Sequence, residues 1–156
     1  MKHARDITGP ATVGHMAEMT GLKGMVITCL RQWNRGGAAA ALAVLRDRMG
    51  ETRAAAAFEA LQDVADSLDA HMRRPLRCHA PHCHCVGADE AAFARFVEES
   101  ALGGREDALM LASLLVEARG ILPLTEAAAR LGLCLHRAVL YESAQRMPDP
   151  VSRTRH

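Results

Sequence analysis

Apolar residues recur at helical spacing along most of the chain. The clearest series alternates steps of four and three residues, with charged residues between: Ala54, Phe58, Leu61, Ala65, Leu68 and Met72. Because an α-helix has about 3.6 residues per turn, this spacing places the six side chains on one face. Pro75 follows and cannot continue a helix. The pattern predicts a helix over 51–74 with one buried face.

The same spacing predicts helices before this one. Residues 16–34 are expected to form one amphipathic helix or two short ones, because apolar side chains recur there every three or four positions. The sequence "NRGG" then predicts a break. A second helix is expected from Ala38 until Gly50, since glycine commonly stops a helix at its C-terminal end.

Further helices are predicted in the C-terminal half. Asp89 is expected to cap a helix that ends near Gly103, with Phe93, Phe96 and Val97 facing inward. The run from Leu109 to Val116 is apolar nearly all round apart from Ser113, which is typical of a central helix covered by several neighbours. Two shorter helices are expected over 123–131 and 135–145, separated by a break at Gly132. The chain is therefore expected to contain about six or seven helices.

Composition supports an all-α fold. Aromatic residues make up 3% of the 156 residues, alanine is abundant and β-branched residues are few, which favours helices over sheets. We expect a single-domain helical bundle over 1–156. An N-terminal helical half is expected over 11–75 and a C-terminal helical half over 88–145. The Cys/His loop, 76–87, joins them, and a loose tail follows over 146–156.

Charge and targeting signals restrict the expected environment. Nineteen Lys and Arg against eighteen Asp and Glu leave a formal charge of +1, which argues against a nucleic-acid or membrane-surface partner. The N-terminal residues lack the apolar core of a secretory signal, and no apolar run is long enough to span a bilayer. We expect a cytoplasmic protein with reduced thiols, whose partner is a second copy or another protein.

The Cys/His loop concentrates six possible metal ligands within eight positions. They are Cys78, His79, His82, Cys83, His84 and Cys85. Thiolate and imidazole are the ligands that Zn²⁺ takes in a tetrahedron, whereas clustered thiolates also suit Cu(I) or an iron–sulfur cluster.

Only a subset of the six can bind one ion. Three ligands are expected from Cys78, Cys83 and Cys85, with His79 or His82 as the fourth, and Pro81 is expected to set the turn that brings them together. Adjacent residues such as Cys83 and His84 point apart. The sequence therefore predicts a metal site, with zinc the first expectation.

Other chemistry remains open for this loop. Cys83 lies beside two histidines that could favour its thiolate form. Cys85 is close enough in sequence to act as the resolving cysteine of a thiol redox protein. A metal-dependent enzyme is a further alternative, although no catalytic residue is identified, and a surface loop that binds metal only incidentally is the simplest one. No histidine follows a glutamate by three positions, which excludes the usual di-iron helical bundle. The expected role is a non-enzymatic interaction, regulatory or sensor module.

A second functional class comes from the C-terminal residues. The segment "LTEAAARLGLCLHRAVLYESA" within 124–145 resembles the helix-turn-helix units of bacterial transcription regulators, with Ala128 and Gly132 at the turn. The resemblance implies a DNA-binding regulator whose second helix enters the major groove and presents His136 and Arg137. The first positions of that helix, "LCLH", are mostly apolar where base and phosphate contacts require polar side chains, so DNA binding is the alternative.

Overall fold

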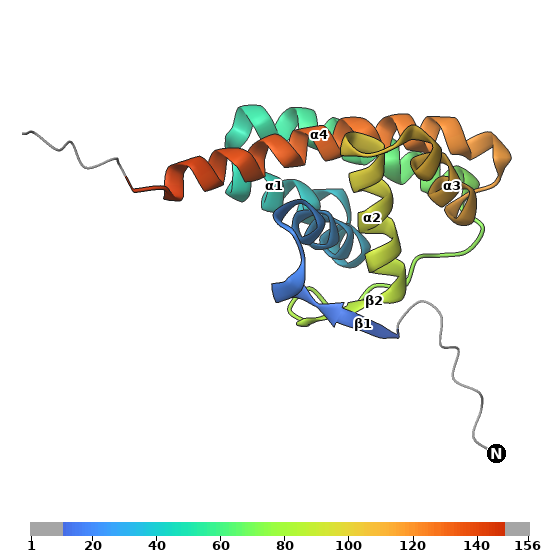
Figure 1. Cartoon of the computed structure of the whole chain (residues 1–156), viewed down its shortest axis with the longest axis horizontal. Coiled ribbons are helices and arrows are strands. Elements are labelled where there is room, and N and C mark those ends of the chain that lie inside the picture. Colours follow the sequence, from blue (N-terminus) through green and yellow to red (C-terminus); the bar gives the residue numbers. More distant parts are fainter. Residues whose placement is uncertain (1–10, 149–156) are drawn as a thin grey trace, which may run out of the picture.

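The computed structural model describes residues 11–148, and they are mostly helical (Figure 1). The helices are α1 (Gly21–His71), α2 (Ala88–Leu102), α3 (Arg105–Leu115) and α4 (Ile121–Arg146), with two 3₁₀ turns at Met16–Glu18 and Ala118–Gly120. Strands β1 (Thr12–His15) and β2 (Cys85–Gly87) form a two-stranded sheet. No helix in this part of the chain has the length and apolar character needed to cross a membrane.

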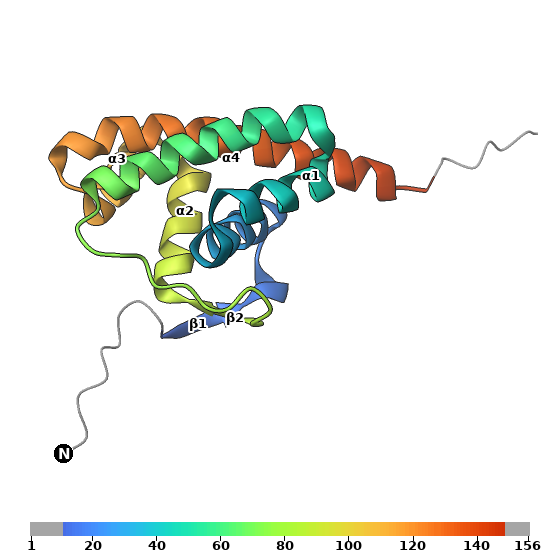
Figure 2. The ribbon, with the colours of Figure 1, turned by 180° about the vertical axis from the view of Figure 1, so that it is seen from behind.

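The predicted count of six or seven helices is wrong, since four are present in residues 11–148. Part of the discrepancy lies in α1, where two predicted breaks are kinks. Gly37 has φ 69° and ψ −160°, and Gly50 has φ 77° and ψ 169°. Positive φ values favour glycine, which has no Cβ to clash with the backbone. The helix resumes at once after each glycine, so α1 changes direction between stretches 21–36, 38–49 and 51–71 (Figure 2).

The remainder of the discrepancy lies in α4, which is continuous through Gly132. A Cβ added to Gly132 would lie 2.6 Å from Ala101 Cβ and 3.0 Å from the Val97 carbonyl oxygen. The glycine therefore permits close packing of α4 on α2 and does not end a helix. Because residues 124–145 lie in one helix, the turn expected for the helix-turn-helix alternative is not formed, and His136 and Arg137 belong to the same helix as Gly132.

The hydrophobic core lies among α1, α2 and α4. As predicted, Phe93, Phe96 and Val97 of α2 are buried. The third stretch of α1 also buries its predicted face, since Ala54, Leu61, Ala65 and Leu68 are buried and Phe58 packs against the core. Both ribbon views show this stretch running alongside α4 (Figures 1 and 2).

Helix α3 is peripheral, so its predicted central position is wrong. Only Ala108 and Ala112 are buried in it. Met110 and Leu114 are 67% and 74% exposed. An all-round apolar sequence does not show how many neighbours cover a helix, and here only one narrow stripe is covered.

The small sheet was not predicted. β1 and β2 pair antiparallel, with His15 opposite Cys85, and the Met16 N–H donates to the His84 carbonyl oxygen at 2.8 Å. The predicted helix from residue 16 therefore starts later, at Gly21, where the Thr20 hydroxyl accepts from the backbone N–H of Lys23 at 3.3 Å. The expected loose tail over 146–156 lies mostly outside the described residues.

We predict opposite effects for two helical glycines. Gly132→Ala should lower the free energy of unfolding by about 1–3 kcal/mol, because the added methyl group overpacks the contact between α2 and α4. Gly24→Ala should raise it by about 0.5–1 kcal/mol, because alanine is the better helix former and its Cβ would meet only Met19 Cβ at 3.9 Å. Urea unfolding measures both changes, and a stabilising Gly132→Ala would contradict the packing assignment.

Candidate functional site

The Cys/His loop is attached to the core by a buried ion pair. Arg31 of α1 and Glu90 of α2 are 2% and 0% exposed. The Arg31 Nε donates to Glu90 Oε1 at 2.6 Å, and its Nη2 donates to Glu90 Oε2 at 2.9 Å. Two parallel bonds between a planar guanidinium and a carboxylate fix the relative orientation of both groups. The pair therefore joins α1 to the start of α2.

Arg31 also holds the backbone of the loop. Its Nη1 donates to the Cys83 carbonyl oxygen at 2.7 Å, and its Nη2 donates to the Cys85 carbonyl oxygen at 2.6 Å. The carbonyl of the intervening His84 faces the opposite way, where it accepts from Met16. The backbone bends at His84, and the strand begins only at Cys85. The carbonyls of Cys83 and Cys85 are therefore both turned toward the Arg31 guanidinium, on either side of this bend.

Glu90 organises the two ends of the loop. Its Oε1 accepts from the His79 backbone N–H and its Oε2 from the Gly87 backbone N–H, each at 2.9 Å. Burial acts to raise the pKa of Glu90, but the hydrogen bonds from Arg31, Gly87 and His79 outweigh it and hold this pKa below its usual value. The hydrogen bond that Arg31 donates to Glu90 in turn raises the pKa of Arg31. Both groups are therefore charged at neutral pH.

Asp89 anchors the chain just before the loop. The prediction that it caps α2 is wrong, because Gly87 occupies the N-cap position. Arg74 donates to both carboxylate oxygens of Asp89 at 2.7 and 2.8 Å, and the Arg77 backbone N–H donates at 2.9 Å. The hydrogen bond from Arg74 is the main cause of the lowered pKa of Asp89. Adjacent acidic residues at the start of α2 thus hold the whole segment from 74 to 87.

The six predicted ligands divide by exposure. Cys78, His79, Cys83 and Cys85 are half-buried, whereas His82 and His84 are exposed. A turn forms at Pro81 as predicted, since the Cys83 N–H donates to the Ala80 carbonyl oxygen at 3.0 Å, but it does not gather Cys78, Cys83 and Cys85 into one group as expected. This turn brings Cys83 Sγ within 3.5 Å of His79 Nδ1. His79 and Cys83 are consequently the closest pair of candidate ligands.

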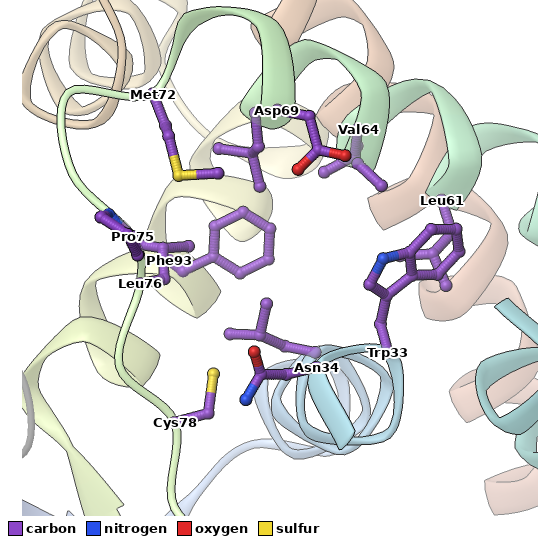
Figure 3. Close-up of a pocket in the computed structure, with 13 residues that line it drawn as sticks. Trp33, Asn34, Leu61, Val64, Asp69, Met72, Pro75, Leu76, Cys78 and Phe93 are labelled. Atoms are coloured by element: carbon purple, nitrogen blue, oxygen red, sulfur yellow. The ribbon is translucent and has the colours of Figure 1, made fainter. Parts of the chain in front are cut away.

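Cys78 faces a cavity on the inner side of the loop (Figure 3). Burial is the main cause that raises the pKa of its thiol to about 11. A thiol with this pKa is almost fully protonated at neutral pH and is a poor nucleophile, because the thiolate is the reactive form. Cys78 is therefore unsuited to attack a disulfide or peroxide in this conformation.

The side chains are not gathered into a complete metal site. Within residues 11–148, no group of three or more His, Cys, Asp or Glu side chains is close enough to hold one ion. The sheet does add a candidate that the sequence pattern did not place near the loop. His15 pairs with Cys85 across the sheet, and directly paired residues of an antiparallel sheet carry their side chains on the same face.

Sequence reasoning missed the residues that position the loop. One signal for them was present, because Arg31 lies four positions after Ile27 and within the apolar face of the first helix. A buried arginine requires a carboxylate partner, but several acidic residues could have served. Only the packing of α2 against α1 selects Glu90.

We predict that Glu90→Gln lowers the free energy of unfolding by about 3–5 kcal/mol, because it leaves the buried Arg31 charge without a counter-charge. Glu98→Gln on the same helix is the control. Glu98 pairs with Lys23 at 3.0 Å, with the two side chains 27% and 29% exposed. Its loss should cost less than about 1 kcal/mol, as for exposed pairs in general. Equal effects in urea unfolding would contradict the role given to Glu90.

The lowered pKa of Asp89 predicts a dependence of stability on acid. When the pKa of a carboxyl group is lower in the folded chain than in the unfolded chain, the charged group stabilises the fold at any pH above its unfolded pKa, which is about 4. This contribution is lost as the pH falls through the folded pKa. We expect Asp89→Asn to flatten the decrease in unfolding free energy below about pH 4. The exposed Asp66→Asn is the control and should keep the wild-type slope in urea unfolding at graded pH.

Comparisons with known proteins add no family to this geometry. No family model matches the chain, and neither a curated protein nor a solved structure does. The function therefore has to be argued from the loop, its attachment to the core and the chemistry of its side chains.

Proposed function

We propose that this chain is a metal-binding helical protein that holds a zinc ion at the Cys/His loop and acts as an interaction, regulatory or sensor module. The observation that carries the proposal is the attachment of the loop backbone to the buried Arg31–Glu90 pair. This attachment orders a segment rich in thiols and imidazoles before any ion arrives. An ordered ligand backbone favours binding, because less conformational entropy is lost when the ion binds.

Three residues are the core of the proposed ligand set. His79 and Cys83 are in contact at 3.5 Å, and Cys85 lies two positions beyond Cys83, with its carbonyl held by the same Arg31 guanidinium. Thiolate and imidazole are the ligands of structural zinc sites. Rotation of these side chains about their Cα–Cβ bonds would be needed to complete the tetrahedron, while the backbone could keep its hydrogen bonds.

The fourth ligand is Cys78 or His15 in this proposal. Cys78 would have to turn away from the cavity, and its thiol would release a proton on binding. His15 is supported by its pairing with Cys85. Zinc held by His15 would join β1 to the loop, so that the shape of this surface would depend on metal. The exposed His82 and His84 are left outside the ligand set.

The proposed setting follows from the thiol chemistry. Zinc ligation requires reduced cysteines, which favours the cytoplasm. A metal-dependent surface at β1 and the Cys/His loop would suit recognition of another protein or of a second copy. Copper or an iron–sulfur cluster would use the same thiols, and measurement of the bound element distinguishes them. The DNA-binding alternative is not favoured, because α4 is continuous where that motif requires a turn.

We predict that untagged protein from metal-replete, reducing growth carries about one zinc per chain. Cys83→Ser should lose this zinc and melt at a lower temperature, because binding of a structural ion contributes to folding. A loss of about 2 kcal/mol would lower Tm by roughly 4–8 °C for a domain of this size. Elemental analysis and calorimetry measure the two effects.

Matched variants separate the ligands from their neighbours. His82→Ala should keep both the zinc and the Tm, because that side chain is exposed and outside the proposed set. Loss of zinc in either Cys78→Ser or His15→Ala, but not in both, identifies the fourth ligand. Metal-free wild-type protein would reject the proposal. A Cys83→Ser variant that keeps its Tm but loses a fast reaction with peroxide would favour thiol redox chemistry instead.

A further inference from the structure

An apolar cavity of about 140 Å³ lies beside the Cys/His loop (Figure 3). Its walls come from the first and third stretches of α1, from the chain that follows α1, and from α2. Trp33, Leu61, Leu68, Met72 and Phe93 supply much of the apolar lining. A cavity of roughly 150 Å³ with such a lining can hold a molecule the size of benzene. The cavity thus fits one aromatic ring or a branched aliphatic group of similar size.

Polar groups occupy only part of the lining. Asp69 lies on one side, and Asn34 and Cys78 lie on another (Figure 3). Asp69 and Asn34 are exposed, and neither side chain has a hydrogen-bond or ion-pair partner among residues 11–148. A carboxylate without a cationic partner at an apolar cavity favours a ligand with an apolar body and one positive charge. The Asn34 amide, on the other side of the cavity, can donate or accept a further hydrogen bond.

We propose that this cavity binds a small primary amine whose body is a single aromatic ring or a compact branched chain. The apolar body occupies the space between Trp33 and Phe93, and the ammonium group contacts the Asp69 carboxylate. Binding places the ligand against Cys78, at the inner side of the Cys/His loop. His79, Cys83 and Cys85, the core of the proposed zinc ligand set, do not line this cavity, whereas Cys78, one of the two candidates for the fourth ligand, does.

Trp33 provides a direct readout, because it is the only tryptophan in the chain. Benzylamine is the probe, and benzyl alcohol is its neutral counterpart of nearly the same size. We expect benzylamine to change Trp33 emission saturably and to bind at least about threefold more tightly than benzyl alcohol, as expected for a partly exposed ion pair. The absence of a saturable response to benzylamine, up to the limit of its solubility, would overturn the proposal. Equal affinity for the two probes would overturn the assignment of an amine.

Three variants test the location of the site. Ala65→Leu places a larger side chain at the cavity wall and should abolish binding of both probes. Asp69→Asn should remove the preference for benzylamine, whereas Asp66→Asn removes the same charge one turn away, outside the cavity lining, and should keep it. Isothermal titration calorimetry checks the affinities, and circular dichroism confirms that each variant is folded. Unchanged binding in folded Ala65→Leu would overturn the assignment of the cavity.

The zinc content of Ala65→Leu separates this inference from the proposed function. Retained zinc together with lost benzylamine binding is the expected result, because the proposed ligands His79, Cys83 and Cys85 lie outside the cavity lining. Loss of zinc from this variant would overturn the independence of the two sites.

Discussion

The arrangement of this protein depends on one buried contact, the bidentate pair of Arg31 and Glu90. Removing two charges from water is costly, and replacement of such a pair by apolar side chains can be neutral or stabilising. Its value lies in geometry, because every remaining bond of the pair reaches the Cys/His loop. Among residues 11–148, no buried side-chain nitrogen or oxygen lacks a hydrogen-bond partner. The pair therefore specifies one position for the loop relative to the helices.

This contact explains how a chemically reactive segment can be ordered without a disulfide or a long strand. Arg31 donates hydrogen bonds to two carbonyls of the loop, and Glu90 accepts hydrogen bonds from two of its backbone N–H groups. These bonds hold the backbone of Cys83 and Cys85 against the Arg31 guanidinium. Cys78 is different, because it faces the cavity. A ligand in the cavity and an ion on the loop would influence each other if both used Cys78, and such coupling is reciprocal.

The helices that carry this contact are shaped by glycines in two distinct ways. Gly37 and Gly50 adopt positive φ, which lets α1 fold back on itself without separate loops. Gly132 keeps helical geometry and instead allows α4 to lie close to α2. All three residues are glycines, and a helix end was predicted at each of them. Only the surroundings of a glycine distinguish a kink, a stop and a close approach.

Composition, hydrophobic periodicity and the position of a proline were enough to predict a helical chain, the buried faces of 54–68 and 93–97, and a turn at Pro81. These features depend on residues close together in sequence. The candidate ligands were also visible, since thiols and imidazoles keep their chemistry in any fold. Tertiary packing decided the rest: the peripheral position of α3, the continuity of α4, the pairing of β1 with β2 and the choice of Glu90 for Arg31. Those two residues are 59 positions apart, and local pattern carries no information about which distant carboxylate a buried cation will meet. The separation of Cys78 from Cys83 and Cys85 has the same origin, because it depends on a cavity built from α1 and α2 together.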